Sequence, residues 1–114
     1  MELDAERLRD LEIFSQGELE VIGRRAIDEI SRHLNAVDDA VAGQDLTVAG
    51  EAAHGARNEA LLMGARELAE AFQSVEDAAR AGDGSGVGEA VGRARALWPS
   101  TREAIALATE RPPA

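Results

Sequence analysis

The longest run of helical periodicity in this chain lies between Glu18 and about Ala42. Its apolar residues recur at the i, i+3, i+4, i+7 spacing that places a single stripe along an α-helix. The stripe consists of Leu19, Ile22, Ala26, Ile27, Ile30, Leu34, Val37 and Val41. The segment therefore predicts a long amphipathic helix that buries this stripe against other helices.

The rest of the chain predicts more helices and no strands. Alternating apolar runs are missing, and only 3% of the residues are aromatic. Pro99 either kinks the last long helix or starts another short one that ends near Thr109, because proline cannot donate to the preceding turn. Besides 18–42, the segments with helical periodicity are about 3–14, 46–63, 65–81 and 85–98, and residues 110–114 are expected to be a frayed tail.

Short connections between long helices favour antiparallel neighbours. The clearest loop is expected at Gly82–Gly86, where glycine, aspartate and serine follow one another. The predicted fold class is all-α. It is a single domain over residues 1–114, an up-down antiparallel four-helix bundle with a short N-terminal helix and a kinked or extra C-terminal helix.

Composition excludes several classes of function. The formal net charge is −10, and an acidic chain without a basic stripe is a poor binder of nucleic acids or anionic membranes. Cysteine is absent, which removes disulfides, thiol nucleophiles and cysteine-based metal sites. The first residues show no signal peptide, and no stretch approaches the roughly 20 apolar residues of a membrane span. We therefore expect a cytoplasmic protein.

One of the two histidines lies on the polar face of its helix. Successive helical residues turn by about 100°, so the directions of side chains can be compared with that of His54. The opposite face is made of small residues suited to close helix packing, namely Ala49, Ala52, Ala53, Ala56, Ala60 and Met63. The His54 face contains Thr47, Gly50, Glu51, Arg57, Asn58 and Leu61. His54 is therefore expected to point to solvent, whereas His33 lies at the edge of its apolar stripe and is interpreted as boundary packing.

At these residues the chain resembles the histidine-containing phosphotransfer (HPt) family, the small helical carriers of bacterial phosphorelays. The family motif is a histidine with lysine three residues later, usually glycine at the fourth position and glycine ten residues on. The matching positions here are His54, Arg57, Asn58 and Gly64, and similar flanking segments extend the resemblance over roughly residues 15 to 98. The chain contains no lysine at all, so arginine is the natural equivalent at position 57.

The resemblance implies a phosphoryl carrier. A neutral imidazole is a good nucleophile at physiological pH, so His54 would be phosphorylated. Arg57, three residues on, could pair with the phosphoryl oxygens. Gly50, Gly55 and Asn58 would leave access to the imidazole, and Leu61 could contribute to an apolar docking surface.

The resemblance also implies that a partner completes the chemistry. No phosphate-binding glycine loop with Lys and Ser/Thr is present, and no cofactor or metal is expected in this chain. The partners would be the receiver domains of a hybrid histidine kinase and of a response regulator, each with an aspartate nucleophile and Mg²⁺. The carrier itself would be a monomer. Its cognate partners, its input signal and the direction of phosphoryl flow are not encoded in any motif.

Two alternatives stay open at this point. Asn58 stands where glycine is usual and Glu59 where a small residue is usual, so the chain could be an HPt-like adaptor that binds receiver or kinase domains without being phosphorylated. A kinase dimerisation bundle would need an acidic residue directly after the histidine, and Gly55 follows instead. Glu76, which matches a family position, is assigned to helix packing or polarity and not to catalysis.

Overall fold

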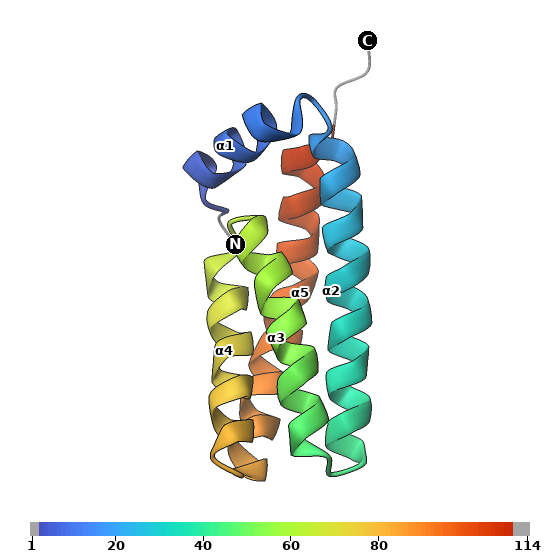
Figure 1. The fold of residues 1–114 in the computed structure, drawn as a ribbon, viewed down its shortest axis with the longest axis vertical. Helices are drawn as coiled ribbons and strands as arrows, with labels where there is room; N and C mark the ends of the chain where they lie inside the picture. Colours follow the sequence, from blue (N-terminus) through green and yellow to red (C-terminus); the bar gives the residue numbers. More distant parts are fainter. Residues whose placement is uncertain (1–2, 111–114) are drawn as a thin grey trace.

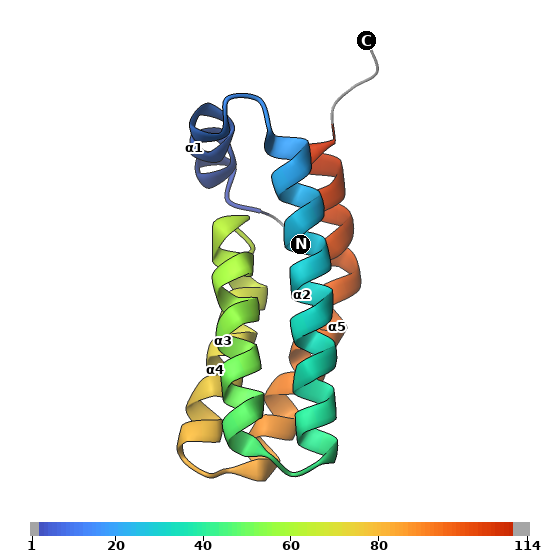
Figure 2. The same cartoon turned by 45° about the vertical axis from the view of Figure 1, so that its right-hand side comes forward.

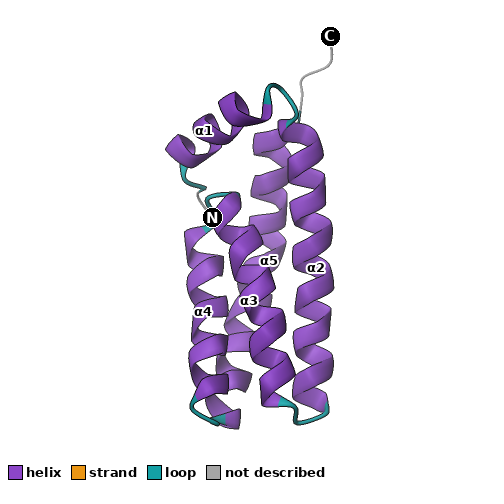
Figure 3. Cartoon of the chain, viewed as in Figure 1, coloured by secondary structure: helices purple, strands orange, loops and turns teal. Residues whose placement is uncertain are grey.

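The computed structural model describes residues 3–110, and every regular element in that range is an α-helix (Figures 1 and 3). The helices are α1 (Ala5–Ser15), α2 (Leu19–Ala42), α3 (Leu46–Leu62), α4 (Arg66–Arg80) and α5 (Gly84–Thr109). The prediction of an all-helical bundle is thus confirmed for these residues. The predicted frayed tail lies almost wholly outside them. None of the described helices is long and apolar enough to cross a membrane.

Helices α2 to α5 lie side by side (Figure 1), and together with α1 the described residues form an elongated body about 49 Å long and 21 Å across. The chain reverses direction at each of the three short connections between them, so α3 packs between α2 and α4, and α5 closes the ring against both (Figures 1 and 2). Helix α1 lies across the end where α3 finishes and α4 begins.

The connections contain the expected capping residues. Asp45 accepts a hydrogen bond from the backbone N–H of Val48 at 3.1 Å, and Asp83 accepts one from Gly86 at 2.9 Å. The Asp83 cap starts α5 at Gly84, so most of the loop predicted at Gly82–Gly86 is instead the first turn of a helix. A Cβ at position 86 would lie 2.5 Å from the Asp83 carboxylate, so a larger residue there would have to displace the capping side chain.

Helix α5 continues through Pro99 to Thr109, so the separate C-terminal helix that Pro99 could have started does not form. Pro99 is exposed, which leaves water free to satisfy the carbonyl that loses its donor. Beyond the proline, Thr101, Ile105 and Thr109 are buried. Thr109 fills the space over Gly23 of α2, where a Cβ would come within 2.1 Å of its hydroxyl oxygen. Burial of this last segment outweighs the missing hydrogen bond.

The alanine face of α3 is buried as its periodicity indicates, except that Ala52 is only partly buried. Ala49, Ala53, Ala56 and Ala60 are fully inaccessible, and Met63 beyond the helix is too. Small side chains let α2 and α4 approach the α3 backbone closely. The larger core residues come from the neighbours, among them Ile30 and Leu34 of α2 and Phe72 and Val75 of α4.

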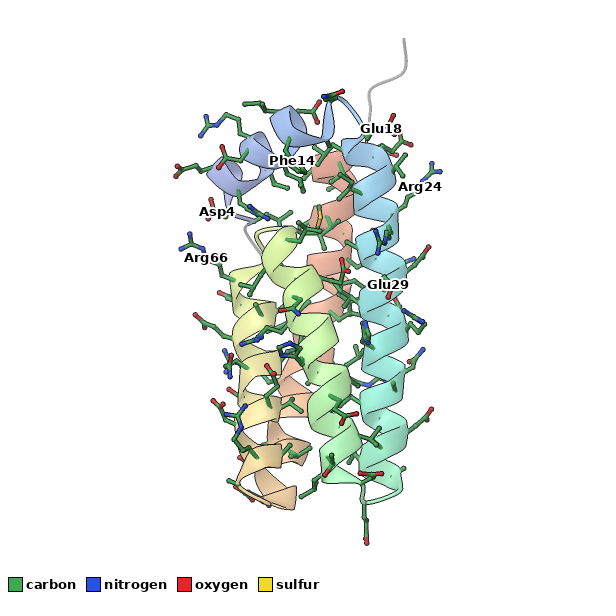
Figure 4. All side chains as sticks on the ribbon, in the orientation of Figure 1. Asp4, Phe14, Glu18, Arg24, Glu29 and Arg66 are labelled. Carbon is green, nitrogen blue, oxygen red and sulfur yellow. The ribbon has the colours of Figure 1, made fainter. Side chains whose placement is uncertain are left out.

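Helix α1 is attached to the bundle by polar contacts and one buried leucine, Leu11. The backbone N–H of Asp4 donates to the Gly64 carbonyl at 2.9 Å, and the Asp4 carboxylate pairs with Arg66 (Figure 4). Gly64 has a φ of +73° and lies so close to Asp4 that a Cβ would be 2.9 Å from its backbone nitrogen. Only glycine fits this position without strain.

Replacing Ala56 with leucine should lower the free energy of unfolding by about 1–3 kcal/mol, because the added carbons have no space at a fully buried site. Denaturant unfolding followed by circular dichroism measures this change. Ala96→Leu, at an exposed position of α5, is the matched control and should leave stability nearly unchanged. Equal stability of both variants would contradict the assigned packing face.

Acid should loosen α1. A hydrogen bond from the Arg7 backbone N–H, followed by the Arg66 side chain, lowers the pKa of Asp4 below its usual 3.8. Because the pKa of Asp4 is lower in the folded protein than in the unfolded chain, ionised Asp4 stabilises the attachment of α1 above the usual value of 3.8. This stabilisation is lost as the pH falls through the lowered pKa of the folded protein. NMR shifts of Leu11 should report this release below about pH 4. Asp4→Asn should remove the pH dependence, and an unchanged pH profile in that variant would refute the explanation.

Candidate functional site

His54 projects from the exposed side of α3 near the middle of the helix. Its side chain is 54% exposed, and the alanine face lies behind it. The sequence placed His54 on the polar face, and the structure agrees on this point. What the sequence did not show is that the imidazole leans on the neighbouring helix α4.

A buried carboxylate of α4 binds the imidazole. Glu76 Oε1 lies 2.7 Å from His54 Nδ1, and the Glu76 side chain is only 8% exposed. Burying an ionised carboxylate is costly unless it is paired. The short distance requires a proton between the two atoms. Because a carboxylate accepts hydrogen bonds, Nδ1 is the donor, and the neutral ring therefore carries its proton on Nδ1.

The other ring nitrogen, Nε2, is consequently unprotonated in the neutral ring. It has no hydrogen-bond partner among residues 3–110. An imidazole held at Nδ1 by a carboxylate keeps one tautomer and one orientation, as in other sites where a second group orients a histidine. The arrangement therefore presents Nε2 with its lone pair available, on a half-exposed side chain.

Arg57 also turns toward α4 and contacts three groups there and on its own helix. Its Nε lies 3.1 Å from Glu76 Oε2, one terminal nitrogen donates to Gln73 Oε1, and the other lies 3.1 Å from His54 Nδ1. The contact with Glu76 is close enough for an ion pair, but it is not a well-directed hydrogen bond for either buried atom. The Nδ1 contact cannot be a hydrogen bond while Nδ1 donates to Glu76.

The Arg57 guanidinium therefore has two acceptor partners on α4, Glu76 Oε2 and Gln73 Oε1, and lies beside the imidazole without bonding it. A lysine ammonium is a single nitrogen and could not present a separate nitrogen to each acceptor. The side chain is 24% exposed, so Arg57 is a partly buried partner of Glu76 and not a freely extended surface cation. The structure thus assigns Arg57 a contact with Glu76 that spacing along α3 alone could not indicate.

The seam between α3 and α4 is hollowed on both sides of this polar cluster. On the side toward the start of α3 lies an open groove of about 390 Å³, lined by Leu46, Thr47, Gly50, Glu51, His54, Glu76, Ala79 and Arg80. On the other side a smaller hollow of about 330 Å³ is lined by Arg57, Leu61, Arg66, Ala69, Glu70 and Gln73. The half-exposed Leu61 is the apolar contribution of α3 to that second hollow.

The remaining site residues proposed from the sequence lie around the cluster. Gly50 lines the groove, and a Cβ there would lie 3.1 Å from the Cβ of Ala79. Asn58 is exposed one turn beyond His54. Gly55 faces α2, where a Cβ would collide with the His33 ring at 2.6 Å. The absent side chain of Gly55 therefore makes room for His33, which is a packing role.

Glu76 is the member of the His54 cluster that sequence reasoning missed. It had been assigned to packing or polarity, whereas the structure bonds it to His54 across 22 positions of the chain. A signal was present, because Glu76 follows Phe72 by four residues and Ala69 by seven, on the buried face of α4. A charge at a core position of an amphipathic helix indicates a buried partner.

No protein-family model, curated protein or solved structure matches the chain. Within residues 3–110, no group of three or more His, Asp or Glu side chains is arranged to hold a metal ion. The function must therefore be argued from the geometry of the His54, Glu76 and Arg57 side chains.

The tautomer of His54 can be measured directly. Nitrogen–proton NMR of the neutral ring should show His54 protonated at Nδ1, because Glu76 accepts that proton. Glu76→Gln should yield a mixture of tautomers, since an amide can either donate or accept. The ring of His33, which lies 3.6 Å from Glu29 and not near Glu76, is the internal control and should not change. Protonation of the parent His54 at Nε2 would refute this geometry.

Proposed function

We propose that the chain is a histidine phosphotransfer protein. It accepts a phosphoryl group from a receiver-domain aspartate onto His54 and passes it to another receiver domain. The observation that supports this most directly is the half-exposed imidazole whose Nδ1 is bound by the buried Glu76. Such a ring offers Nε2 as a nucleophile to a partner but has no catalytic site of its own around it.

The proposed transfer balances in atoms and charge. The Nε2 lone pair of His54 attacks the phosphorus of an aspartyl phosphate, and a P–N bond forms. The P–O bond to the aspartate breaks, and its electron pair leaves on the carboxylate. The ring becomes a phosphorylated imidazolium with its proton still on Nδ1. Glu76, 2.7 Å from that nitrogen, lies where it can stabilise the new positive charge.

Arg57 has a positioning role in this proposal. Its contacts with Glu76 and Gln73 hold the carboxylate against the imidazole. The attraction between unlike charges is strong in a partly buried site, so the cation also compensates the buried carboxylate. This role differs from the one expected for Arg57 from its spacing alone, which was direct contact with the phosphoryl oxygens.

The missing parts of the reaction would come from the receiver domain, namely the acidic nucleophile and Mg²⁺. Docking would use the seam between α3 and α4, where Leu61 and Ala69 give the second hollow its apolar area. The arrangement of α2 to α5 as an up-down four-helix bundle, a monomeric state and a cytoplasmic location belong to the same proposal. The tertiary arrangement suits it because the partner can approach His54 from the open side of the seam.

Phosphate uptake should depend on His54 alone. Incubation with a phosphorylated receiver domain, followed by mass measurement under neutral conditions that preserve phosphohistidine, should show one added phosphoryl group. His54→Gln should abolish uptake, and His33→Gln, the matched control, should retain it. His54→Gln should still bind the receiver, because docking depends on the surrounding surface. Uptake by His54→Gln equal to that of the parent would refute the carrier.

Asn58→Gly separates the carrier from the adaptor. If Asn58 crowds the imidazole, glycine should speed transfer, at a cost to folding of up to about 1 kcal/mol from the helix interior. A chain that binds receiver domains but is not phosphorylated by them, either as the parent or as Asn58→Gly, is the adaptor instead.

A further inference from the structure

Arg57, the cation expected to bind the phosphoryl group, already has partners in the structure. Arg57 contacts Glu76, Gln73 and His54, and only 24% of its side chain is exposed. Moving it onto a phosphoryl group at Nε2 would take a cation away from a buried carboxylate, which is costly. A second cation close to His54 would avoid that cost.

Arg80 is such a cation. It lines the same groove as His54, from the opposite wall, on α4. It follows Glu76 by four residues and therefore lies one turn away on the same face of that helix. Its side chain is 76% exposed and its ion pair, with Asp77, is long at 3.7 Å. Asp77 also accepts a hydrogen bond from Gln73 at 3.0 Å, so Arg80 is only loosely held.

The side chains of His54 and Arg80 lean toward the same part of the groove. Helical side chains lean toward the N-terminus of their own helix. His54 on α3 therefore leans toward Gly50, that is, into the groove. Helix α4 runs the other way, so Arg80 leans back toward Glu76 and the level of the imidazole.

The groove also has room for the group. Gly50 and Ala79 approach so closely that a Cβ on the glycine would lie 3.1 Å from the alanine Cβ, so small residues bring the walls together between His54 and the start of α3. The groove volume of about 390 Å³ is several times that of a phosphoryl group, which leaves space for a partner side chain as well.

From this geometry we infer that the groove on the Gly50 side of His54 is the phosphoryl-binding site of the protein, and that Arg80 is the cation that contacts the phosphoryl oxygens. The inference rests on the proposed transfer to His54. It gives Arg57 and Arg80 different roles. Arg57 holds Glu76 against the imidazole. Arg80 swings from Asp77 onto the phosphoryl oxygens, where a guanidinium can bind two of them at once.

Two acidic side chains line this groove, Glu51 and Glu76. Glu76 is paired with His54 and Arg57, so the acidic side chain that opposes a bound anion is the exposed Glu51. Glu59, the acidic residue that departs from the family pattern, does not line the groove. The like charges of a carboxylate and a phosphate repel each other, so Glu51 should weaken binding. Removing the charge of Glu51 should therefore strengthen phosphate binding, whereas removing the charge of Arg80 should weaken it.

Inorganic phosphate tests the groove without any transfer chemistry. Titration of the folded protein, followed by amide NMR shifts, should move Thr47, Gly50 and Glu51 in the parent and in His54→Gln. Arg80→Ala should weaken this binding about tenfold, which corresponds to about 1.4 kcal/mol. Arg80→Lys should restore part of it, and Glu51→Gln should tighten it. Absence of phosphate-dependent shifts in the parent would overturn the inference.

Arg24→Ala is the matched control for Arg80→Ala. Arg24 is an equally exposed arginine, paired with Glu20 on α2 and remote from the groove (Figure 4). Phosphoramidate, a small donor that can phosphorylate histidine without a receiver domain, supplies the second measurement. The lifetime of the phosphohistidine should fall several-fold in Arg80→Ala and stay at the parent value in Arg24→Ala. An unchanged lifetime in Arg80→Ala, with a shortened one in Arg57→Ala, would assign the contact to Arg57.

The two proposals can fail separately. Phosphate binding that requires Arg80, in a protein that no receiver domain phosphorylates, would remove the carrier function and keep the groove as an anion site. A receiver domain could instead phosphorylate the parent and Arg80→Ala equally fast, with no phosphate-dependent shifts at Gly50. That result would support the carrier function and refute the groove as the phosphoryl-binding site.

Discussion

The pairing of a buried carboxylate with two side chains of the neighbouring helix organises the middle of this bundle. Glu76 is almost inaccessible to water, and it is tolerated there because His54 Nδ1 and the Arg57 guanidinium meet its two oxygens. The charge of such a group, left without partners, would cost several kcal/mol. The contact therefore joins α3 to α4 at this level and holds the imidazole by its Nδ1 atom.

Small residues on the opposite face of α3 determine how closely this helix approaches its neighbours. Four alanines on its inner face bring the α3 backbone close to its neighbours, and the large side chains come from α2 and α4. An imidazole can then reach across the seam to a carboxylate at 2.7 Å while more than half of its surface stays exposed. Packing on one face of α3 thus determines the chemistry available on the other.

The proposed division of roles between two arginines follows from where each one lies relative to water. Arg57 is partly buried and is held by Glu76 and Gln73, which suits a residue that positions others. Arg80 is exposed and loosely paired, which suits a residue that must move onto an incoming anion. A single cation could hardly do both, because leaving Glu76 would uncover a buried charge each time the phosphoryl group arrived.

Periodicity alone determined much of this structure. The helical segments and the buried face of α3 could be predicted because apolar spacing reports which side of a helix faces the core. His54 and Arg57 could be chosen because residues three apart share a helix face. The two ends predicted for the last long helix were less accurate than these faces. The Asp83 cap starts α5 within the expected loop, and burial of Thr109 carries α5 through Pro99.

The contacts between helices were decided only by the tertiary structure. Glu76 and Arg80 lie 22 and 26 positions from His54, and spacing within one helix says nothing about which residue of the next helix stands opposite. That register depends on the lengths of the connections, the caps and the depth of side-chain packing together. The sequence by itself therefore determined the faces of the helices and the exposure of His54, whereas the fold determined which nitrogen of that imidazole is held and which arginine is only loosely paired.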